Sequence, residues 1–503
     1  MRLSCILAAA IFAASFQVAG AVYVANPGDD IKTMADNLVP GDTLQLHGGT
    51  YDTPGLFLGN KAGTAALPVV IEAYPGEKPV MNCIDFSRNC IDISNCSYLT
   101  LRGLEVKGSG GDGAKSTANT VNDHITIEYC VFHDVIGCGI NTKGNDTNWL
   151  VRYNEVYNTN VTGEGMYFGT NDSNIYVLQH SIVEYNYVHH TGGSQGDGIE
   201  IKWGGHGNTI RHNVLHNIRQ PSIITQYGEA GSPNIVEGNV IMDCTVDAGI
   251  QVYRNTIVRN NIVMNTALYG IAVRPMTSTT KNITIVNNTF FNCKGAVYVR
   301  DADASVVVAN NACYELSAAQ DAMVLVNSSV TSSGNVYYGN LNGTWSGCTP
   351  GNAPSVDMED PAGMDFWPTA SSTLVDTATA GYAPTTDFNG SPRPYGGWYD
   401  VGAYERSVSS NPGWVIQKDF KQLIPYTPDV TAPTIVLGNV RISLTVTDAS
   451  ALKPQIWIDG TSYAMTGGAY TSAWLSVTKG HVFAIEAEDI FNNRRRVELK
   501  ADW

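Results

Sequence analysis

Six short segments of this chain carry the residues that could do chemistry. Each begins with Gly or Ser and continues with alternating apolar and mostly polar residues, from Gly139, Gly165, Gly198, Ser222, Gly249 and Gly270. Successive side chains of a β-strand point to opposite faces, so the third and fifth places of each segment share one outer face. These places carry amide, carboxylate, phenol and cationic groups: Asn141, Tyr167, Glu200 and Gln251 in one column, and Lys143, Lys202, Gln226, Tyr253 and Arg274 in the next. At a spacing of about 4.8 Å per strand, they predict a groove for a sugar chain.

Lys202 is the predicted catalytic base, because a lysine beside other cations can have its pKa lowered toward neutrality. The alternative for Lys202 is an ordinary ammonium that pairs with Glu200. Tyr167 is predicted to supply a proton and Arg274 to contact a carboxylate, with plain packing and ordinary surface charge as the alternatives. The substrate-binding candidates share this face or the loop after Lys202: Lys143, Asn141, Gln226, Tyr227, Gln251, Tyr253 and His206.

Two further carboxylates precede the glycine of adjacent segments. Glu164 and Asp197 occupy equivalent places, and Glu200 follows Asp197 on the same segment. Carboxylate oxygens are hard ligands that suit Ca²⁺, so these three residues are the predicted metal ligands. The alternative is that each carboxylate only caps its own turn.

A recurring Asn indicates the elements that would position these groups. Its seven copies, at Asn154, Asn186, Asn213, Asn239, Asn261, Asn288 and Asn311, are 32, 27, 26, 22, 27 and 23 residues apart. The flanking residues alternate with period two, and the spacing fits one coil of roughly 22 residues plus loops. An Asn at one corner of every coil can bond the next Asn and tolerate a sharp bend. The sequence therefore predicts an all-β fold, a right-handed parallel β-helix filled by Ile, Val and Phe.

Histidine and cysteine follow the same repeat. The third place after the Asn corner predicts an outward stacked column on another strand, made of His133, Tyr157, His189 and His216. Nine cysteines follow Cys5 and form no Cys-x-x-Cys pair, so a zinc site of that kind is not expected. Cys130 falls in the Asn column, which favours buried thiols, although Cys83–Cys90 or Cys90–Cys96 can form a disulfide in an oxidising compartment.

Composition narrows the class of protein. The chain has 503 residues, 50 Gly and 15% charged residues, which suits a loop-rich β-solenoid with a large core. The formal net charge of −16 argues against a nucleic-acid partner or an anionic membrane surface. The apolar run after Arg2, followed by Ala19-Gly20-Ala21, has the parts of a secretory signal, so we expect an extracellular or periplasmic monomer.

The domain organisation is predicted in four parts. A signal peptide covers residues 1–21, the β-helix 22–410 and a Pro-containing linker 411–433. Within the β-helix, we expect coils to about residue 333 and an irregular closing segment over 334–404. Short alternating runs over 434–503 predict a small immunoglobulin-like β-sandwich as a non-catalytic module.

The ends of the β-helix carry motifs of a known group, which include Pro40-Gly41-Asp42-Thr43, Gly48-Gly49-Thr50-Tyr51, Asp387-Phe388-Asn389-Gly390 and Asp400-Val401-Gly402-Ala403-Tyr404. Over residues 22 to 405 the chain resembles secreted bacterial β-helix proteins of the polysaccharide lyase superfamily, families nine and six. Family nine places a cluster of Asp around calcium beside one Lys, and Asp197, Glu200 and Lys202 resemble that cluster. Family six uses a Glu-x-Glu calcium motif, and this chain has Glu200-Ile201-Lys202 in its place.

The resemblance implies β-elimination on an acidic, uronic-acid-containing polysaccharide. Such a lyase needs donors or a cation for the carboxylate, a base for the C5 proton and a proton for the leaving oxygen. Three alternatives remain on the same fold. A C5-epimerase would share the base, a glycoside hydrolase would use Glu164, Asp197 and Glu200 as its acid and base, and a binding or adhesive solenoid would have no turnover.

Overall fold

The computed structural model describes residues 20–413 except 172–174, 229–230 and 278, together with Ile416 and the strands between residues 434 and 500. The predicted signal peptide and linker lie almost wholly outside the described residues. The chain divides into two compact units, residues 1–424 and 425–503. Within the described part of the chain, no helix has the length and apolar character needed to cross a membrane.

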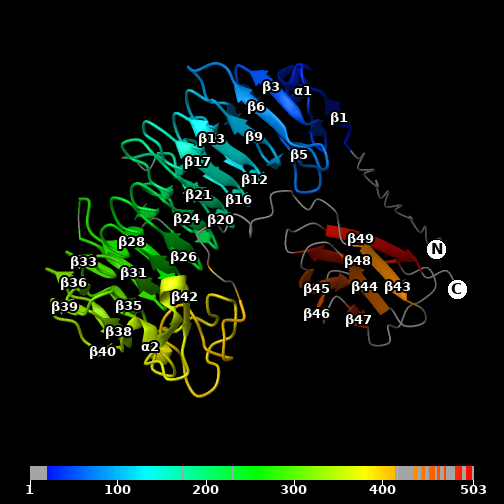
Figure 1. Ribbon diagram of the computed structural model, residues 1–503. Coiled ribbons are helices and arrows are strands. Elements are labelled where there is room, and N and C mark those ends of the chain that lie inside the picture. The colour runs from blue at the N-terminus through cyan, green and yellow to red at the C-terminus, as the bar shows by residue number, and fades with distance from the viewer. Residues whose placement is uncertain are drawn as a thin grey trace, which may run out of the picture. The chain divides into compact units, whose positions relative to one another are not determined.

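The first unit is a right-handed parallel β-helix, in which the strands of successive coils stack side by side (Figure 1). Three series of parallel strands run along it. The first series carries the predicted groove: β4 (Leu56–Gly59), β7 (Ile91–Ser94), β10 (Ala114–Ser116), β14 (Ile140–Thr142), β18 (Met166–Phe168), β22 (Ile199–Ile201), β25 (Ile223–Tyr227), β28 (Ile250–Arg259), β30 (Ile271–Val273), β33 (Val297–Arg300), β36 (Asp321–Val326) and β39 (Asn340–Asn342).

The second series follows the first within each coil, and the long strand β28 belongs to both. Its strands are β1 (Val22–Ala25), β2 (Thr43–Leu46), β5 (Val69–Ala73), β8 (Leu99–Arg102), β12 (Thr126–Glu128), β16 (Leu150–Arg152), β20 (Ile182–Glu184), β23 (Thr209–Arg211), β26 (Asn234–Glu237), β28, β31 (Lys281–Val286), β34 (Val306–Ala309) and β37 (Thr331–Ser333).

The third series closes each coil. Its strands are β3 (Gly49–Thr53), β6 (Pro79–Cys83), β9 (Glu105–Lys107), β13 (Val131–Val135), β17 (Glu155–Thr159), β21 (Tyr187–His189), β24 (Val214–His216), β27 (Val240–Met242), β29 (Ile262–Met264), β32 (Thr289–Phe291), β35 (Ala312–Tyr314), β38 (Asn335–Tyr338) and β40 (Cys348–Pro350). β38 pairs in parallel with β35 and with β40, so the coils extend past residue 333. The closing segment therefore begins later than residue 334, where the sequence analysis placed its start.

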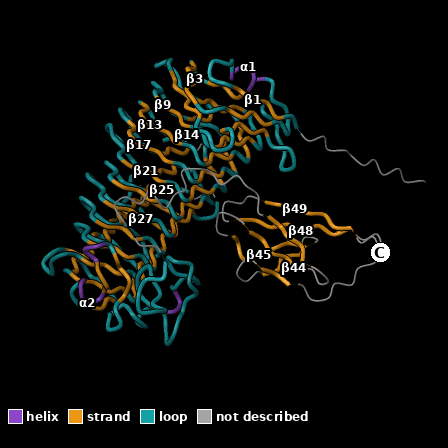
Figure 2. Tube along the Cα trace, turned by 45° about the vertical axis from the view of Figure 1, so that its right-hand side comes forward, coloured by secondary structure: helices purple, strands orange, loops and turns teal. Residues whose placement is uncertain are grey.

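Short elements complete the unit. Three corner strands pair with one another: β11 (Val121–Asp123), β15 (Asn145–Thr147) and β19 (Leu178–Gln179). The helix α1 (Ile31–Asp36) lies near the start of the unit, and α2 (Pro354–Asp357) precedes the antiparallel pair β41 (Met358–Asp360) and β42 (Asp365–Pro368). Two single 3₁₀ turns cover Pro361–Gly363 and Ala380–Tyr382. Figure 2 shows how little helix the first unit contains and how its loops lie between the short strands.

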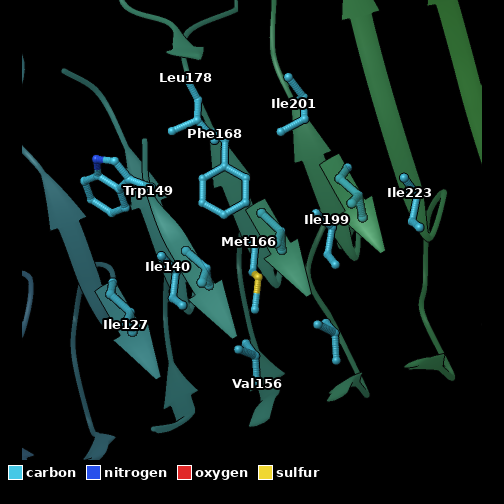
Figure 3. Close-up of a cluster of buried hydrophobic side chains, with 14 of the residues drawn as sticks. Ile127, Ile140, Trp149, Val156, Met166, Phe168, Leu178, Ile199, Ile201 and Ile223 are labelled. Carbon is cyan, nitrogen blue, oxygen red and sulfur yellow. The ribbon is translucent and has the colours of Figure 1, made fainter. Parts of the chain in front are cut away.

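Alternating burial explains why these short segments form strands. In β7, Ile91 and Ile93 are fully buried while Asp92 and Ser94 are partly exposed. Figure 3 shows the inward side chains of neighbouring coils in the interior, with those of Ile140, Met166, Phe168, Ile199 and Ile201 on the first series. Continuous burial of such residues along the axis is the main stabilising contribution in a solenoid, where each coil contacts only its neighbours.

The predicted Asn column is present and buried. The backbone N–H and the Nδ2 of Asn154 both donate to Oδ1 of Asn186 at 3.0 Å, and this bonding repeats down the column. The column begins where the N–H of Cys130 donates to Asn154, as the sequence predicted for this cysteine, and it continues one coil further than predicted, to Asn335. The bend itself falls on the preceding residue, since Tyr153 rather than Asn154 has a positive φ.

The outward column of rings is also confirmed. His133, Tyr157 and His189 stack at centroid distances of 4.8 and 4.9 Å, and His216 pairs with His189 in the strand register. Of the two disulfides considered, Cys83–Cys90 forms, and Cys96 is a buried free thiol.

The second unit contains two antiparallel sheets. One consists of β43 (Thr434–Gly438), β44 (Ser443–Thr447) and β47 (Ala469–Thr471). The other consists of β46 (Thr461–Ala464), β45 (Leu452–Ile458), β48 (Val482–Asp489) and β49 (Arg494–Lys500).

A buried acid near the C-terminal coils gives a prediction about stability. Glu315 is fully buried, and burial raises its pKa to about 9 against the opposing effect of a backbone hydrogen bond from Ala296. The folded state therefore holds a proton that the unfolded state releases above about pH 4.3, so this group's contribution to stability falls as pH rises from there toward 9. We expect Glu315→Gln to melt several degrees above the wild type at pH 8, with the difference shrinking toward pH 5, in thermal unfolding followed by circular dichroism. A difference that is independent of pH would contradict this explanation.

Candidate active site

The strand register brings the predicted column together. Asn141 pairs with Tyr167, Tyr167 with Glu200, Glu200 with Ile224 and Ile224 with Gln251. These residues therefore lie side by side on successive strands of the first series. They are less exposed than an outer face predicts, since Asn141, Tyr167 and Gln251 are each 5% exposed.

Three carboxylates form the centre of the site. Atoms of Glu164, Asp197 and Glu200 all lie within 4.8 Å of one another, and all three residues are buried. Burial, followed by the negative charges of Glu200 and Glu164, raises the pKa of Asp197 to about 9. Burial also raises the pKa of Glu200. Crowded acids of this kind hold a proton unless a cation neutralises them.

Glu200 links the carboxylates to the basic residues. Its Oε1 accepts from Nζ of Lys202 at 2.7 Å and from Nε2 of Gln226 at 2.8 Å. Its Oε2 is buried and has no hydrogen-bond partner among the described residues. Lys202 therefore forms the ion pair with Glu200 that the sequence analysis gave as its alternative role, and this ion pair lies in the buried carboxylate cluster.

Two lysines lie against the ring of Tyr167. Nζ of Lys143 is 3.8 Å from the ring centroid and Nζ of Lys202 is 4.7 Å from it, which is the range of cation–π contacts. The hydroxyl of Tyr167 donates to Oδ1 of Asn171 at 2.8 Å. Gly169 occupies the fifth place of the intervening segment with a φ of 105°, and a Cβ there would lie 3.1 Å from Cβ of Lys202. The missing side chain leaves room for both lysines.

A second group of polar side chains, centred on Arg274, lies on the following coils. The Nε of Arg274 donates to Oε1 of Gln251 at 2.9 Å, and its Nη2 pairs with Asp247 at 2.7 Å. Nε2 of Gln251 in turn donates to the hydroxyl of Tyr253. Arg274 thus keeps its guanidinium in place on this strand face, with a quarter of its side chain exposed.

Aromatic side chains continue this group. The ring of Tyr227 lies 4.5 Å from that of Trp203 and 5.5 Å from that of Tyr253, and its hydroxyl accepts from the backbone N–H of Met276 and Thr277. Trp203 was not predicted as a site residue, although it directly follows Lys202 in the sequence.

Asp112 and Cys138 were also missed. Asp112 Oδ2 accepts from Nδ2 of Asn141 at 2.9 Å, its Oδ1 accepts from the N–H of Cys138, and the thiol of Cys138 lies 3.5 Å from Glu164. Both residues precede a glycine, in the place that Glu164 and Asp197 occupy two coils later. That shared place was the signal that could have identified them.

His206 is placed apart from this cluster. Its Nδ1 bonds the carbonyl of Gly204 at 2.9 Å, and its ring meets His180 edge-on at 5.5 Å. Among the described residues, no hydrogen bond or ring contact joins His206 to Glu164, Asp197 or Glu200. The sequence proximity of His206 to Lys202 therefore does not bring its ring to the carboxylates.

Comparisons with known proteins agree with this fold. A family described as Pel9A-like, right handed beta helix region, matches residues 13–220, and a right handed beta helix region matches 182–313. The pectate lyase PEL9 of Emericella nidulans is 27% identical over 176 residues, which span 29% of this chain and 42% of that protein. The match therefore covers less than half of that relative.

Two solved structures are similar in outline. The crystal structure of pectate lyase Pel9A is 15% identical, with a TM-score of 0.48, over 77% of this chain and 97% of that one. A mutant of the PL6 family alginate lyase AlyGC is 17% identical, with a TM-score of 0.48, over 70% and 56%. The family matches and the Emericella relative confirm the resemblance to right-handed β-helix proteins of the polysaccharide lyase superfamily.

Proposed function

We propose that this protein is a polysaccharide lyase that cleaves an acidic, uronic-acid-containing polysaccharide by β-elimination. The observation that carries the proposal is the buried carboxylate cluster of Glu164, Asp197 and Glu200, directly beside Lys202 and Tyr167 on the strand face that the family resemblance implicates. Acids, amines and a phenol in contact on one surface supply the groups that elimination needs.

The carboxylates fit a calcium ion. Three buried acids share one place, Asp197 retains a proton at neutral pH when no cation is present, and Oε2 of Glu200 has no hydrogen-bond partner within the described part of the chain. Hard carboxylate oxygens are the ligands that Ca²⁺ prefers. Glu164, Asp197 and Glu200 would hold the ion, which when bound supplies positive charge for the substrate carboxylate.

The remaining residues have separate roles in the proposal. Lys202 is the base predicted from the sequence, Lys143 is a second amine at the same phenol ring, and Tyr167 supplies a proton to the leaving oxygen. Asn141, Gln226 and Gln251 are amides that orient the sugar hydroxyls, while the partly exposed ring of Trp203, which packs on the buried Tyr227 and Tyr253, offers an aromatic platform for a sugar ring.

Product analysis tests the proposal. The purified protein is incubated with polygalacturonate, polymannuronate, polyguluronate and glucuronate-containing glycosaminoglycans, and the oligosaccharides are weighed by mass spectrometry. Elimination gives products lighter by one water than hydrolysis products, with an unsaturated terminal sugar. Hydrolysis products would instead support a glycoside hydrolase. An unchanged chain length with an altered sugar configuration would support a C5-epimerase. Glycan that is bound but unaltered would support a binding protein.

Arg274 gives a prediction within this proposal. A charged hydrogen bond to a substrate carboxylate contributes about 1.5–3 kcal/mol, so Arg274→Ala is expected to lower kcat/KM by roughly 10-fold to 100-fold. Arg259→Ala is the matched control, because that arginine pairs with Glu237 on the second series. Equal losses in both variants would show that Arg274 acts only through stability.

Export and an accessory module complete the proposal. The apolar N-terminal run supports secretion to the extracellular space or periplasm. The two antiparallel sheets after residue 433 support an immunoglobulin-like sandwich that does not take part in catalysis.

A further inference from the structure

We propose that Lys143, and not Lys202, is the base that removes the C5 proton of the uronate. The inference rests on the proposed lyase function and deepens it. It starts from a difference between the two lysines at the Tyr167 ring: among the described residues, one has a carboxylate partner and the other has none.

Lys202 is engaged in a buried ion pair. Its Nζ lies 2.7 Å from Oε1 of Glu200, and both side chains are less than a tenth exposed. The Nζ of Lys202 is thus directed at Glu200 in a buried ion pair, and removing it would leave the charge of Glu200 uncompensated. An amine engaged in this way is poorly placed to approach a C5 proton.

Lys143 has a different environment. Its Nζ donates to the carbonyl of Gly169 at 3.0 Å and lies over the ring of Tyr167, and among the described residues no carboxylate is within ion-pair distance of it. The nearby lysine of the preceding coil, Lys115, is itself paired with Asp112 at 2.9 Å. Lys143 is thus the lysine of this cluster without an ion pair.

The charges around Lys143 favour its neutral form. Burial is the largest cause that lowers its pKa, to about 8, and the positive charges of Lys115 and Lys202 act in the same direction. Asp112 on the loop before β10 and the thiol of Cys138 on the loop before β14 oppose the shift. A useful fraction of the amine is neutral at mildly alkaline pH, as a general base requires.

The geometry also places an acid next to this base. Nζ of Lys143 is 3.8 Å from the centre of the Tyr167 ring, whose hydroxyl is directed to Asn171 on the loop after β18. A sugar seated on this part of the groove would meet an amine and a phenol on one wall. Lys202 would then face the same sugar as a cation that stabilises negative charge at the uronate carboxylate.

The step balances without a further reactant. The neutral amine of Lys143 takes the proton from C5, and the electron pair of that bond forms the C4=C5 double bond. The C4–O4 bond breaks, and O4 leaves with the proton of the Tyr167 hydroxyl. Lys143 then returns its proton to water and Tyr167 takes one back, so the products are an unsaturated uronate and a new sugar end.

Three variants of the full-length protein test the assignment: Lys143→Met, Lys143→Arg and Lys202→Met. Initial rates are followed by the ultraviolet absorbance of the unsaturated product between pH 6 and pH 10, and circular dichroism shows whether each variant is folded. Lys107→Met, on the third series, is the control with unchanged rates.

We expect both Lys143 variants to lose roughly 10²-fold to 10⁴-fold in kcat with little change in KM, because arginine keeps the charge but does not accept a proton at these pH values. The wild-type kcat should rise with pH through an apparent pKa near 8. That rise should persist in Lys202→Met and be absent from the residual rate of Lys143→Met. Partial rescue of Lys143→Met by added ethylamine would support the same assignment.

The failures of the two proposals are distinguishable. A folded Lys143→Arg variant that keeps its kcat would overturn the assignment of the base and leave the lyase function intact, since Lys143 would then only bind a carboxylate. Loss of the pH-dependent rise in Lys202→Met, and not in Lys143→Met, would return the role to Lys202. A wild-type protein that forms no unsaturated product on any acidic polysaccharide would refute the lyase function and this assignment with it.

Discussion

Asp197→Asn is expected to abolish the stabilisation of the protein by Ca²⁺ while leaving its stability without Ca²⁺ unchanged or slightly higher. Asp197 carries a proton at neutral pH in the crowded carboxylate cluster, where its pKa is about 9, so asparagine resembles the form already present. A ligand that binds the folded state at a hundred times its Kd adds about 2.7 kcal/mol to the free energy of unfolding. The variant lacks a hard anionic ligand and should lose that gain.

The activity should fall with the stabilisation. Loss of the cation removes several kcal/mol of charge stabilisation for the reacting carboxylate, so we expect kcat/KM to drop by roughly 10²-fold or more. Thermal unfolding with Ca²⁺, with Mg²⁺ and with a chelator measures the first effect, and product formation measures the second. Asp92→Asn is the matched control, because Asp92 lies on the same series of strands and outside the cluster.

Two outcomes would contradict the calcium site. The first is a Ca²⁺-dependent rise in melting temperature that is the same in Asp197→Asn and in the wild type. The second is an Asp197→Asn variant that melts well below the wild type in chelator, because that would make Asp197 a structural residue of its turn.

Asn213→Ala is expected to be the most destabilising single substitution of the coils. Oδ1 of Asn213 accepts from the backbone N–H and the Nδ2 of Asn186, and its own Nδ2 donates to the carbonyl of Val183 and to Asn239. Alanine would remove all four hydrogen bonds in a fully buried corner and leave the backbone N–H of Asn186 without this acceptor, while Nδ2 of Asn186 keeps the carbonyl of Val151 and Oδ1 of Asn239 keeps the N–H of residue 213. At about 1–3 kcal/mol for the unsatisfied N–H and about 1 kcal/mol for each other lost bond, we expect a loss on the order of 4 kcal/mol.

Denaturant unfolding of the isolated wild type and variant measures this loss. Asn145→Ala, an exposed asparagine on the corner strand β15, is the control and should change the free energy of unfolding by about 0.5 kcal/mol or less. Similar losses in the two variants would show that the buried column does not hold the coils together.

The fold could be predicted from the sequence because its signal repeats. Asn154 and Asn186 recur at the same corner of successive coils. The alternation of apolar residues around them indicates short strands with one face toward the interior of a parallel solenoid. The end of the coils was missed because the repeat weakens there: Asn335 continues the column, but Gly334 and the short strands after it resemble a loop.

The site could be predicted only in part. Register on adjacent strands follows from the repeat, so Tyr167 and Glu200 were placed together correctly. Burial and pairing do not follow from it, because they depend on how far each side chain reaches across the coils. The ion pair of Lys202, the absence of such a pair at Lys143 within the described part of the chain, and the contact of Cys138 with Glu164 therefore needed the structure.

Calcium-dependent β-elimination is measured most directly by the ultraviolet absorbance of purified protein with a panel of uronic-acid polysaccharides, recorded with Ca²⁺ and again with a chelator. We expect a steady rise on at least one substrate, which stops when the chelator is added and resumes with excess Ca²⁺. Flat absorbance on every substrate in the presence of Ca²⁺ would contradict elimination by this groove.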